Sequence, residues 1–371
     1  MTAYRLRPAL ALLVASVGAV ASLTGSLRAG AQAWEPVGAP TTTSLRGVSA
    51  PSRSVVWVSG AGGAVARSTD AGATWSLVSV PGADSLDFRD IAAFDASTAY
   101  VLSIGNGTQS RIYKTTDGGT TWTLQFTNAD SSAFYDCFAF WDAERGIAMS
   151  DPVAGRVQVR TTQDGGASWQ LLPQDAAPLA LEGEAGFAAS GTCVATGSAG
   201  RAWIATGGGP RARALRTTDY GQSWAYGDIT PIAAGAAPRG AFSIAVIDDA
   251  RLVATGGNYE QPVDTGGVAA LSHDGGVTWH RVRGPVPRGY RSGVAVVPQA
   301  AGPTVVAVGT SGTDYSLDGG ESWIAADTLA LNAVTFVAPD AGWAVGPRGR
   351  VVRWRGAFAP AIRRGAKDAH R

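Results

Sequence analysis

Short apolar segments alternate with turns rich in Gly, Ser and Asp along most of the chain. Segments such as 56–60, 99–102 and 342–346 contain Val, Trp, Tyr and Ala and end at small residues. Such lengths and side chains predict β-strands. An opening strand is expected upstream of each, at seven places: 45–48, 88–91, 134–137, 184–187, 241–244, 290–293 and 331–334. The pattern therefore predicts an all-β protein built from seven repeated units.

One motif recurs six times: Ser or Thr, any residue, Asp, any residue, Gly, two further residues and Trp. The motif begins at residues 68, 115, 162, 217, 272 and 316, which places successive Trp residues about 44–55 positions apart. Repeats of this length are typical of propeller blades that contain four short strands each.

The motif predicts a hairpin turn. Its Asp accepts hydrogen bonds from backbone amides a few residues later, its Gly supplies a positive φ, and its Trp packs between neighbouring blades. A catalytic role would require six identical active sites, so we interpret these carboxylates as structural. They are Asp70, Asp117, Asp164, Asp219, Asp274 and Asp318.

Six motifs and seven opening strands are reconciled at the two ends of the repeat region. The last repeat stops after residues 349–354, one strand short of a blade, whereas residues 34–37 resemble a fourth strand without the preceding three. We therefore expect residues 34–37 to complete the last blade and close a seven-bladed propeller over residues 34–356. Closure of this kind removes an exposed sheet edge. Residues 357–371 are expected to be a disordered basic tail.

The first 33 residues have the features of a secretory signal peptide. Arg5 and Arg7 precede an apolar run over 9–23, and an Ala-x-Ala site predicts cleavage after Ala33. The run is shorter than the roughly 20 residues of a membrane span. We expect an extracytoplasmic, monomeric protein with no membrane span after cleavage. The only two cysteines, Cys137 and Cys193, could form a disulfide there or remain buried thiols.

Composition excludes several classes of function. The 371 residues carry 30 basic and 29 acidic side chains, so the net charge of +1 gives no electrostatic footprint for nucleic acid. Three scattered His and two Cys provide no metal or haem ligand set, and no strand–GxGxxG–helix unit is present for a dinucleotide. We therefore expect no cofactor and no metal, and we exclude an oxidoreductase.

The repeats resemble the Asp-box (BNR-like) propellers of the sialidase-like superfamily, within the broader WD40/YVTN/BNR-like group. The fuller pattern, with the segments at 45–48 and 342–346 before each motif, is most similar to the photosystem II stability and assembly factor-like family. This resemblance implies a seven-bladed propeller and a binding or assembly role; bacterial relatives are often labelled oxidoreductase or glycosyl hydrolase. The sialidase Arg element has its nearest match at 88–91, without its Pro and one blade late, and its three-Arg clamp has no assignable counterpart.

Opening strands line the central channel of a propeller, so their polar residues are the first candidates for a site. Four acids could act as a general acid or a nucleophile in glycosidic hydrolysis: Asp90, Asp136, Asp151 and Glu184. Candidate ligand-binding residues are Arg89, Tyr135, Glu182, Tyr259, Tyr290 and Arg291. Longer insertions are expected at 197–213 and 256–267, where Arg211, Arg213 and Arg216 either bind an anion or form a solvated face.

Two functions are consistent with these residues. The first is an extracytoplasmic binding or assembly module that holds a protein segment or a glycan at the channel mouth. The second is a glycoside hydrolase that uses two of the four acids, which would have to lie about 5–10 Å apart in an open groove. If Arg–Asp pairs such as Arg89–Asp136 neutralise these acids locally, the chemistry is absent. We favour the binding module.

Overall fold

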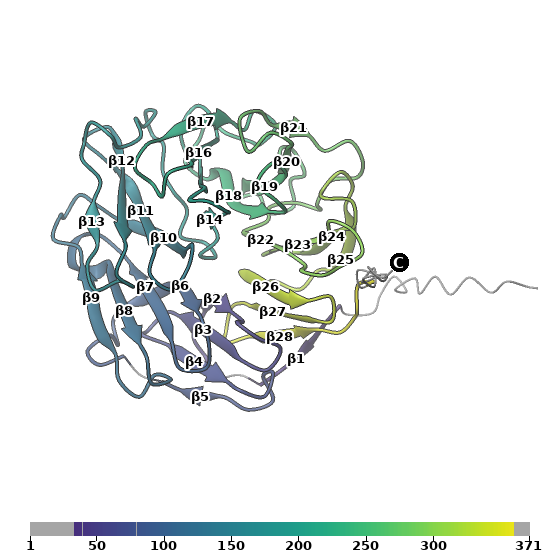
Figure 1. The fold of residues 1–371 in the computed structure, drawn as a ribbon. Helices are drawn as coiled ribbons and strands as arrows, with labels where there is room; N and C mark the ends of the chain where they lie inside the picture. The colour runs from purple at the N-terminus through teal and green to yellow at the C-terminus, as the bar shows by residue number, and fades with distance from the viewer. Residues whose placement is uncertain (1–32, 39, 79, 360–371) are drawn as a thin grey trace, which may run out of the picture. The chain divides into compact units, whose positions relative to one another are not determined.

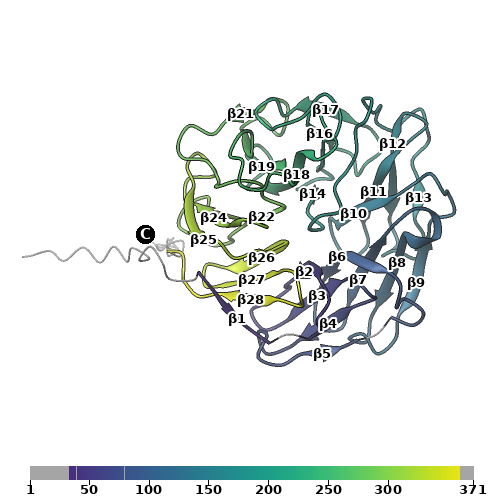
Figure 2. The ribbon, with the colours of Figure 1, turned by 180° about the vertical axis from the view of Figure 1, so that it is seen from behind.

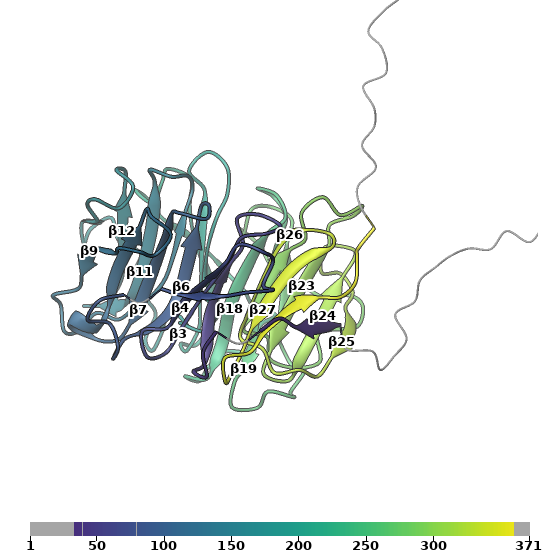
Figure 3. The same ribbon diagram turned by 90° about the horizontal axis from the view of Figure 1, so that it is seen from below.

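The computed structural model describes residues 33–38, 40–78 and 80–359. These residues form seven four-stranded antiparallel sheets arranged in a ring (Figure 1). Seen from below, the sheets stand side by side around the ring (Figure 3). The predicted all-β, seven-bladed propeller is confirmed. No α-helix occurs in the described residues, and none of their helices is long and apolar enough to cross a membrane.

Strand position within a blade determines burial. The innermost strands are β2 (Leu45–Ser49), β6 (Asp87–Ala93), β10 (Tyr135–Phe140), β14 (Val194–Thr196), β18 (Arg239–Val246), β22 (Gly293–Val296) and β26 (Ala333–Ala338). The second strands are almost entirely buried between neighbouring blades: β3 (Val56–Gly60), β7 (Ala99–Ile104), β11 (Gly146–Val153), β15 (Ala202–Thr206), β19 (Leu252–Asn258), β23 (Val305–Gly309) and β27 (Ala341–Val345). Their continuous Val, Ala, Ile and Trp content matches burial on both faces.

The outer half of each blade is progressively more exposed. The third strands are β4 (Val65–Ser68), β8 (Arg111–Thr115), β12 (Arg156–Thr162), β16 (Arg213–Thr217), β20 (Ala269–Ser272), β24 (Gly312–Ser316) and β28 (Val351–Trp354). The fourth strands are β5 (Ser76–Leu77), β9 (Thr123–Thr127), β13 (Gln170–Leu171), β17 (Ala225–Asp228), β21 (His280–Arg281), β25 (Ile324–Asp327) and β1 (Trp34–Pro36). A short 3-10 helix, η1 (Gly107–Gln109), precedes β8.

The N-terminal strand closes the ring, as predicted. Strand β1 pairs antiparallel with β28, with Trp34 opposite Trp354, and the two lie side by side from the front and from behind (Figures 1 and 2). The Trp34 side chain is 1% exposed, and its indole donates a hydrogen bond to the Thr313 hydroxyl of the neighbouring blade at 2.9 Å. The predicted signal peptide lies outside the described residues, except for Ala33.

Each repeated motif forms a tight turn between its third and fourth strands. In the first, the Asp70 carboxylate accepts hydrogen bonds from the Thr74 amide and from the Ser68 hydroxyl, both at 2.8 Å. Gly72 has a φ of 95°, a region that favours Gly. The other five motifs repeat these bonds. These bonds lie within the turn, and turn carbonyls also accept from neighbouring blades, as the Ala71 carbonyl does from the Trp343 indole at 3.0 Å.

The packed region continues beyond the expected boundary at residue 356. Phe358 is 8% exposed, and its ring stacks on that of Trp354 with centroids 5.2 Å apart. Its amide donates to the Pro339 carbonyl at 2.9 Å. The start of the segment expected to be a tail is therefore part of the last blade's core, and residues 360–371 lie outside the described residues.

Blade four differs from the sequence-based expectation. Its innermost strand is β14, and not the predicted 184–187, which makes only an isolated bridge between Ala185 and Gly207. The predicted insertion at 197–213 is mostly the hairpin of β15 and β16, whereas the long link lies earlier, over 172–193. The predicted strand in blade six, 290–293, likewise precedes β22 except for Gly293. In both blades the innermost strand begins later in the chain than predicted.

Candidate functional site

A loop from blade four occupies the central channel. We call residues 184–192 the channel loop. It contacts innermost strands on both sides of the ring: Arg46 donates to the Ala189 carbonyl at 3.4 Å, and Arg89 donates to the Ala188 carbonyl at 3.0 Å. On the opposite side, the Ser190 hydroxyl donates to the Ser292 carbonyl at 2.7 Å. A segment in contact with blades one, two and six lies within the channel.

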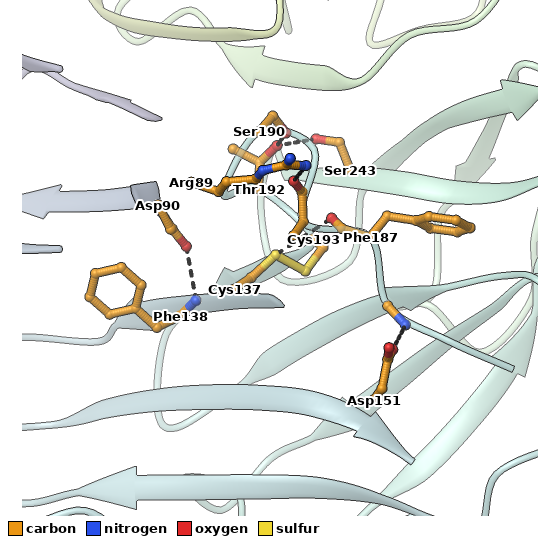
Figure 4. Close-up of a disulfide and its surroundings, with 12 residues drawn as sticks. Arg89, Asp90, Cys137, Phe138, Asp151, Phe187, Ser190, Thr192, Cys193 and Ser243 are labelled. Atoms are coloured by element: carbon orange, nitrogen blue, oxygen red, sulfur yellow. Dashed lines mark hydrogen bonds between the residues drawn. A yellow bond between two sulfur atoms is a disulfide. The ribbon is translucent and has the colours of Figure 1, made fainter. Parts of the chain in front are cut away.

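The channel loop is fixed at its C-terminal end by a disulfide. Cys193, directly before β14, is bonded to Cys137 of β10, with the two Cα atoms 6.1 Å apart (Figure 4). The Thr192 hydroxyl forms hydrogen bonds with the hydroxyls of Ser190 at 2.7 Å and Ser243 at 2.6 Å. The sequence had left a disulfide and two free thiols as alternatives. The disulfide connects the channel loop directly to blade three.

A pair of carboxyl groups lies beneath the N-terminal part of the channel loop. Asp151 accepts a hydrogen bond from the Gly186 amide at 2.8 Å (Figure 4), and the Asp136 carboxyl group lies next to the same glycine. Burial raises the pKa of Asp151 to about 6. Burial and the neighbouring Asp151 carboxylate raise the pKa of Asp136 well above its usual value. We call these two residues the acid pair; burial favours the protonated form of both.

The other two candidate acids have internal partners. Glu184 forms a fully buried ion pair with Arg213, whose Nε lies 2.8 Å from Oε1, and it also accepts from the Leu181 amide at 2.8 Å. Asp90 accepts from the Phe138 amide at 2.9 Å (Figure 4), and burial raises its pKa. A Cβ at Gly191 would clash with the Asp90 carboxylate. These contacts hold the channel loop and leave neither acid accessible to a substrate.

A cavity of about 360 Å³, which we call the central pocket, is bounded on one side by the channel loop. Residues 187–189 form this wall, and the remaining lining comes from blades one, two, five and six: Arg46, Arg89, Phe242, Tyr259, Tyr290 and Thr310. Three of the six predicted ligand-binding residues, Arg89, Tyr259 and Tyr290, therefore meet in one cavity. Phe187 and Phe242 were not among the predicted ligand-binding residues. Phe187 had been assigned to a strand, and Phe242 is apolar, whereas the prediction considered polar residues.

Aromatic rings form one wall of the central pocket. The rings of Phe187 and Phe242 are stacked with centroids 3.7 Å apart, and Tyr290 packs edge-on against Phe242 at 4.8 Å. Tyr259 is 47% exposed and lies at the rim. Flat apolar surfaces held by mutual packing favour an aromatic or aliphatic ligand group.

The opposite wall carries positive charge. Arg46 and Arg89 both line the pocket, and burial together with the Arg89 charge lowers the pKa of Arg46. Arg89 forms an ion pair with Asp87 at 2.8 Å, and not with Asp136 as the sequence suggested. Arg46 has no acidic partner within 4.0 Å among the described residues. The pocket thus combines an aromatic wall with a partly desolvated guanidinium.

The remaining candidate residues lie elsewhere. Arg291 is fully buried, and its Nε donates to Asp314 at 2.8 Å. The Tyr135 hydroxyl accepts a hydrogen bond from Arg160 at 2.6 Å. Glu182 is exposed in a turn before the channel loop. Of the three neighbouring arginines, Arg213 pairs with Glu184 and Arg211 with Asp228, whereas Arg216 lines a separate cavity.

Other cavities have similar volumes but different surroundings. One of about 340 Å³ lies between blades four and five and includes Arg201, Arg216 and Asp249, of which Arg201 and Asp249 form an ion pair at 3.5 Å. Among the described residues, no group of three or more His, Cys, Asp or Glu is placed to hold a metal ion. The central pocket is the cavity that gathers the predicted ligand-binding residues.

Known structures place the fold among propellers of several functions. No family model matches the chain, and no curated protein does. It is similar to YCF48 bound to D1 peptide and to YCF48 from Cyanidioschyzon merolae, each with 17% identity and a TM-score of 0.61. These matches cover 88% and 87% of this chain and 96% and 99% of those structures.

A third match is an ancestral GH74 enzyme, with 16% identity and a TM-score of 0.60 over 87% of this chain and 46% of that one. At these identities the similarities show the fold alone. The matched propellers include one with a bound peptide and one glycoside hydrolase, so the fold does not choose between the two functions.

Proposed function

We propose that the protein is a binding module that holds a segment of another protein in the central pocket. The main support is that an aromatic wall and the two arginines Arg46 and Arg89 line one accessible cavity. Hot spots of protein recognition are enriched in such aromatic and Arg side chains. The cavity, about 360 Å³, is large enough for one or two side chains and not for a folded domain.

A peptide is favoured over a neutral glycan by the chemistry of the walls. The pocket offers four aromatic rings and two cations, which suit an apolar group next to a negative charge. The similarity to YCF48 bound to D1 peptide gives an analogy for peptide binding on this fold. We also propose that the chain is related to the Asp-box, photosystem II assembly factor-like propellers, on the strength of its six repeated motifs.

A peptide array with a blocked pocket tests this proposal. Thr310 lines the cavity in an exposed turn and makes no side-chain hydrogen bond, so Thr310→Trp should fill the cavity without unfolding the blade. Leu77 lies on an outer strand and is 62% exposed, so Leu77→Trp is the matched control. We expect wild type and Leu77→Trp to bind a common set of peptides that Thr310→Trp does not bind. Equal binding by all three proteins would place the peptide site elsewhere and reject the proposal.

The acid pair favours a second candidate, a glycoside hydrolase. A carboxyl group with a pKa of about 6 suits a general acid. However, Asp136 is 2% exposed and Asp151 accepts a hydrogen bond from the Gly186 amide of the channel loop, so the pair lacks the open groove that glycosidases need for substrate and water. A panel of chromogenic glycosides distinguishes the two: turnover by wild type and its loss in Asp151→Asn would establish the hydrolase.

We further propose that the protein acts outside the cytoplasm after removal of residues 1–33. The Cys137–Cys193 disulfide supports this location, because disulfides persist in oxidising compartments. Mass spectrometry of the protein secreted from its own host checks the location, with Trp34 expected as the first residue. Recovery of the uncleaved chain in the cytoplasm would contradict it.

A further inference from the structure

The two guanidiniums of the central pocket have donors to spare. Arg46 donates one hydrogen bond within the described residues, the 3.4 Å contact to Ala189. Arg89 donates to Asp87 and to the Ala188 carbonyl. Each guanidinium carries five N–H groups, so several remain available at the cavity. Partial burial strengthens any hydrogen bond that these groups make with an anion.

The charge balance around the pocket matches a ligand with a single negative charge. Asp87 offsets the charge of Arg89 through its 2.8 Å ion pair, whereas Arg46 has no such partner among the described residues. Among the described residues that line the pocket, Arg46 is therefore the cation without an ion-pair partner, which suits a ligand group with a single negative charge such as a carboxylate.

Resting on the proposed function, we infer that the central pocket recognises a carboxylate next to an aromatic or large aliphatic group of the bound segment. Arg46 and Arg89 hold the carboxylate, and the rings of Phe242 and Tyr290 contact the apolar group. The carboxylate is either the C-terminus of a chain or the side chain of Asp or Glu, since both present the same planar oxygens to a guanidinium.

Small probes separate the charge from the apolar group. N-acetylphenylalanine carries a terminal carboxylate, and N-acetylphenylalanine amide is its neutral control. Ac-Asp-Phe-NH2 and Ac-Asn-Phe-NH2 form the same comparison for a side-chain carboxylate. Dissociation constants come from ligand-observed NMR titrations of the full chain. We expect at least one acid to bind about tenfold or more tightly than its amide, because hydrogen bonds to charged groups are strong. The acid–amide pair with the larger difference in affinity shows whether the carboxylate is a C-terminus or a side chain.

Variants of Arg46 test whether the preference for acids over amides arises in the central pocket. Arg46→Gln should reduce the acid-to-amide ratio toward one, and Arg46→Lys should retain part of the preference. Arg46 makes a single long hydrogen bond, so neither change should alter Tm by more than about 1 °C. Arg283→Gln is the control, because Arg283 is 88% exposed and is not one of the pocket-lining residues. Higher salt should weaken the binding of the acids more than the binding of the amides.

Three results would overturn the inference, and they differ in what they say about the proposed function. Equal binding of acids and amides, lost in Thr310→Trp, rejects the carboxylate site but keeps a peptide pocket. Binding of methyl glucuronide with no binding of the phenylalanine probes identifies an acidic sugar as the occupant. Failure of every probe to bind, together with a negative peptide array, rejects both the carboxylate site and the binding module.

Discussion

Replacement of Trp34 by Ala tests whether the N-terminal strand supports the ring. The Trp34 indole is 1% exposed, lies edge-on to Trp354 with centroids 5.0 Å apart, and donates to Thr313. Truncation of a buried Trp costs about 3–5 kcal/mol, and loss of a buried hydrogen bond adds about 1 kcal/mol. With the usual unfolding entropy per residue, the combined loss lowers Tm by roughly 6–9 °C for a domain of this size.

Differential scanning calorimetry measures this change directly. Leu77→Ala is the control, since Leu77 lies on the fourth strand of blade one but is 62% exposed, and we expect its Tm to shift by less than about 1 °C. Deletion of residues 34–38 should lower Tm further and promote aggregation, because it uncovers the edge of β28. A Tm for Trp34→Ala within 1 °C of wild type would refute the reasoning.

Three further predictions concern the channel loop. Glu184→Gln should lower the unfolding free energy in urea by about 3–5 kcal/mol, because it leaves the Arg213 charge buried without its partner, whereas Glu182→Gln at an exposed position should be neutral. The double change Cys137→Ser, Cys193→Ser should lower the unfolding free energy by roughly 4 kcal/mol, because it opens a loop with a sequence separation of 56. It should also weaken binding in the central pocket. Unchanged affinity would show that the pocket does not depend on this anchor. The folded state, with the Asp151 pKa raised to about 6, retains a proton that the unfolded chain releases near pH 4. The stability of the wild type should therefore decrease as pH rises from 5 to about 7.5. Asp151→Asn should reduce this fall in Tm.

The fold could be predicted because its signals are local and repeated. Six copies of one turn motif fixed the blade length, and the incomplete last repeat with the strand-like 34–37 segment predicted closure through β1 and β28. The hydrogen bonds between the motif's own residues make it recognisable without knowledge of the tertiary fold. The segment 184–187 was wrongly assigned to a strand, and it belongs to the channel loop.

The central pocket could be predicted only in part. Arg89, Tyr259 and Tyr290 were found because they lie on or just beside strands whose position in the ring is predictable. Arg291 has the same kind of position but turns to Asp314, a side-chain choice that no spacing reveals. The meeting of Phe187 with Phe242 depends on the path of the channel loop, which the Cys137–Cys193 disulfide anchors at one end. Asp136 and Asp151 meet because they lie on the paired strands β10 and β11.

The most direct test of the account is a crystal structure of the protein with the tightest peptide from the array. The account predicts an apolar side chain against Phe242 and Tyr290, with a carboxylate within hydrogen-bond distance of Arg46 and Arg89. The main competing mode is addition of the peptide as an extra strand to an exposed outer strand such as β5 or β13. A peptide bound there, with the central pocket free of it, would contradict the account.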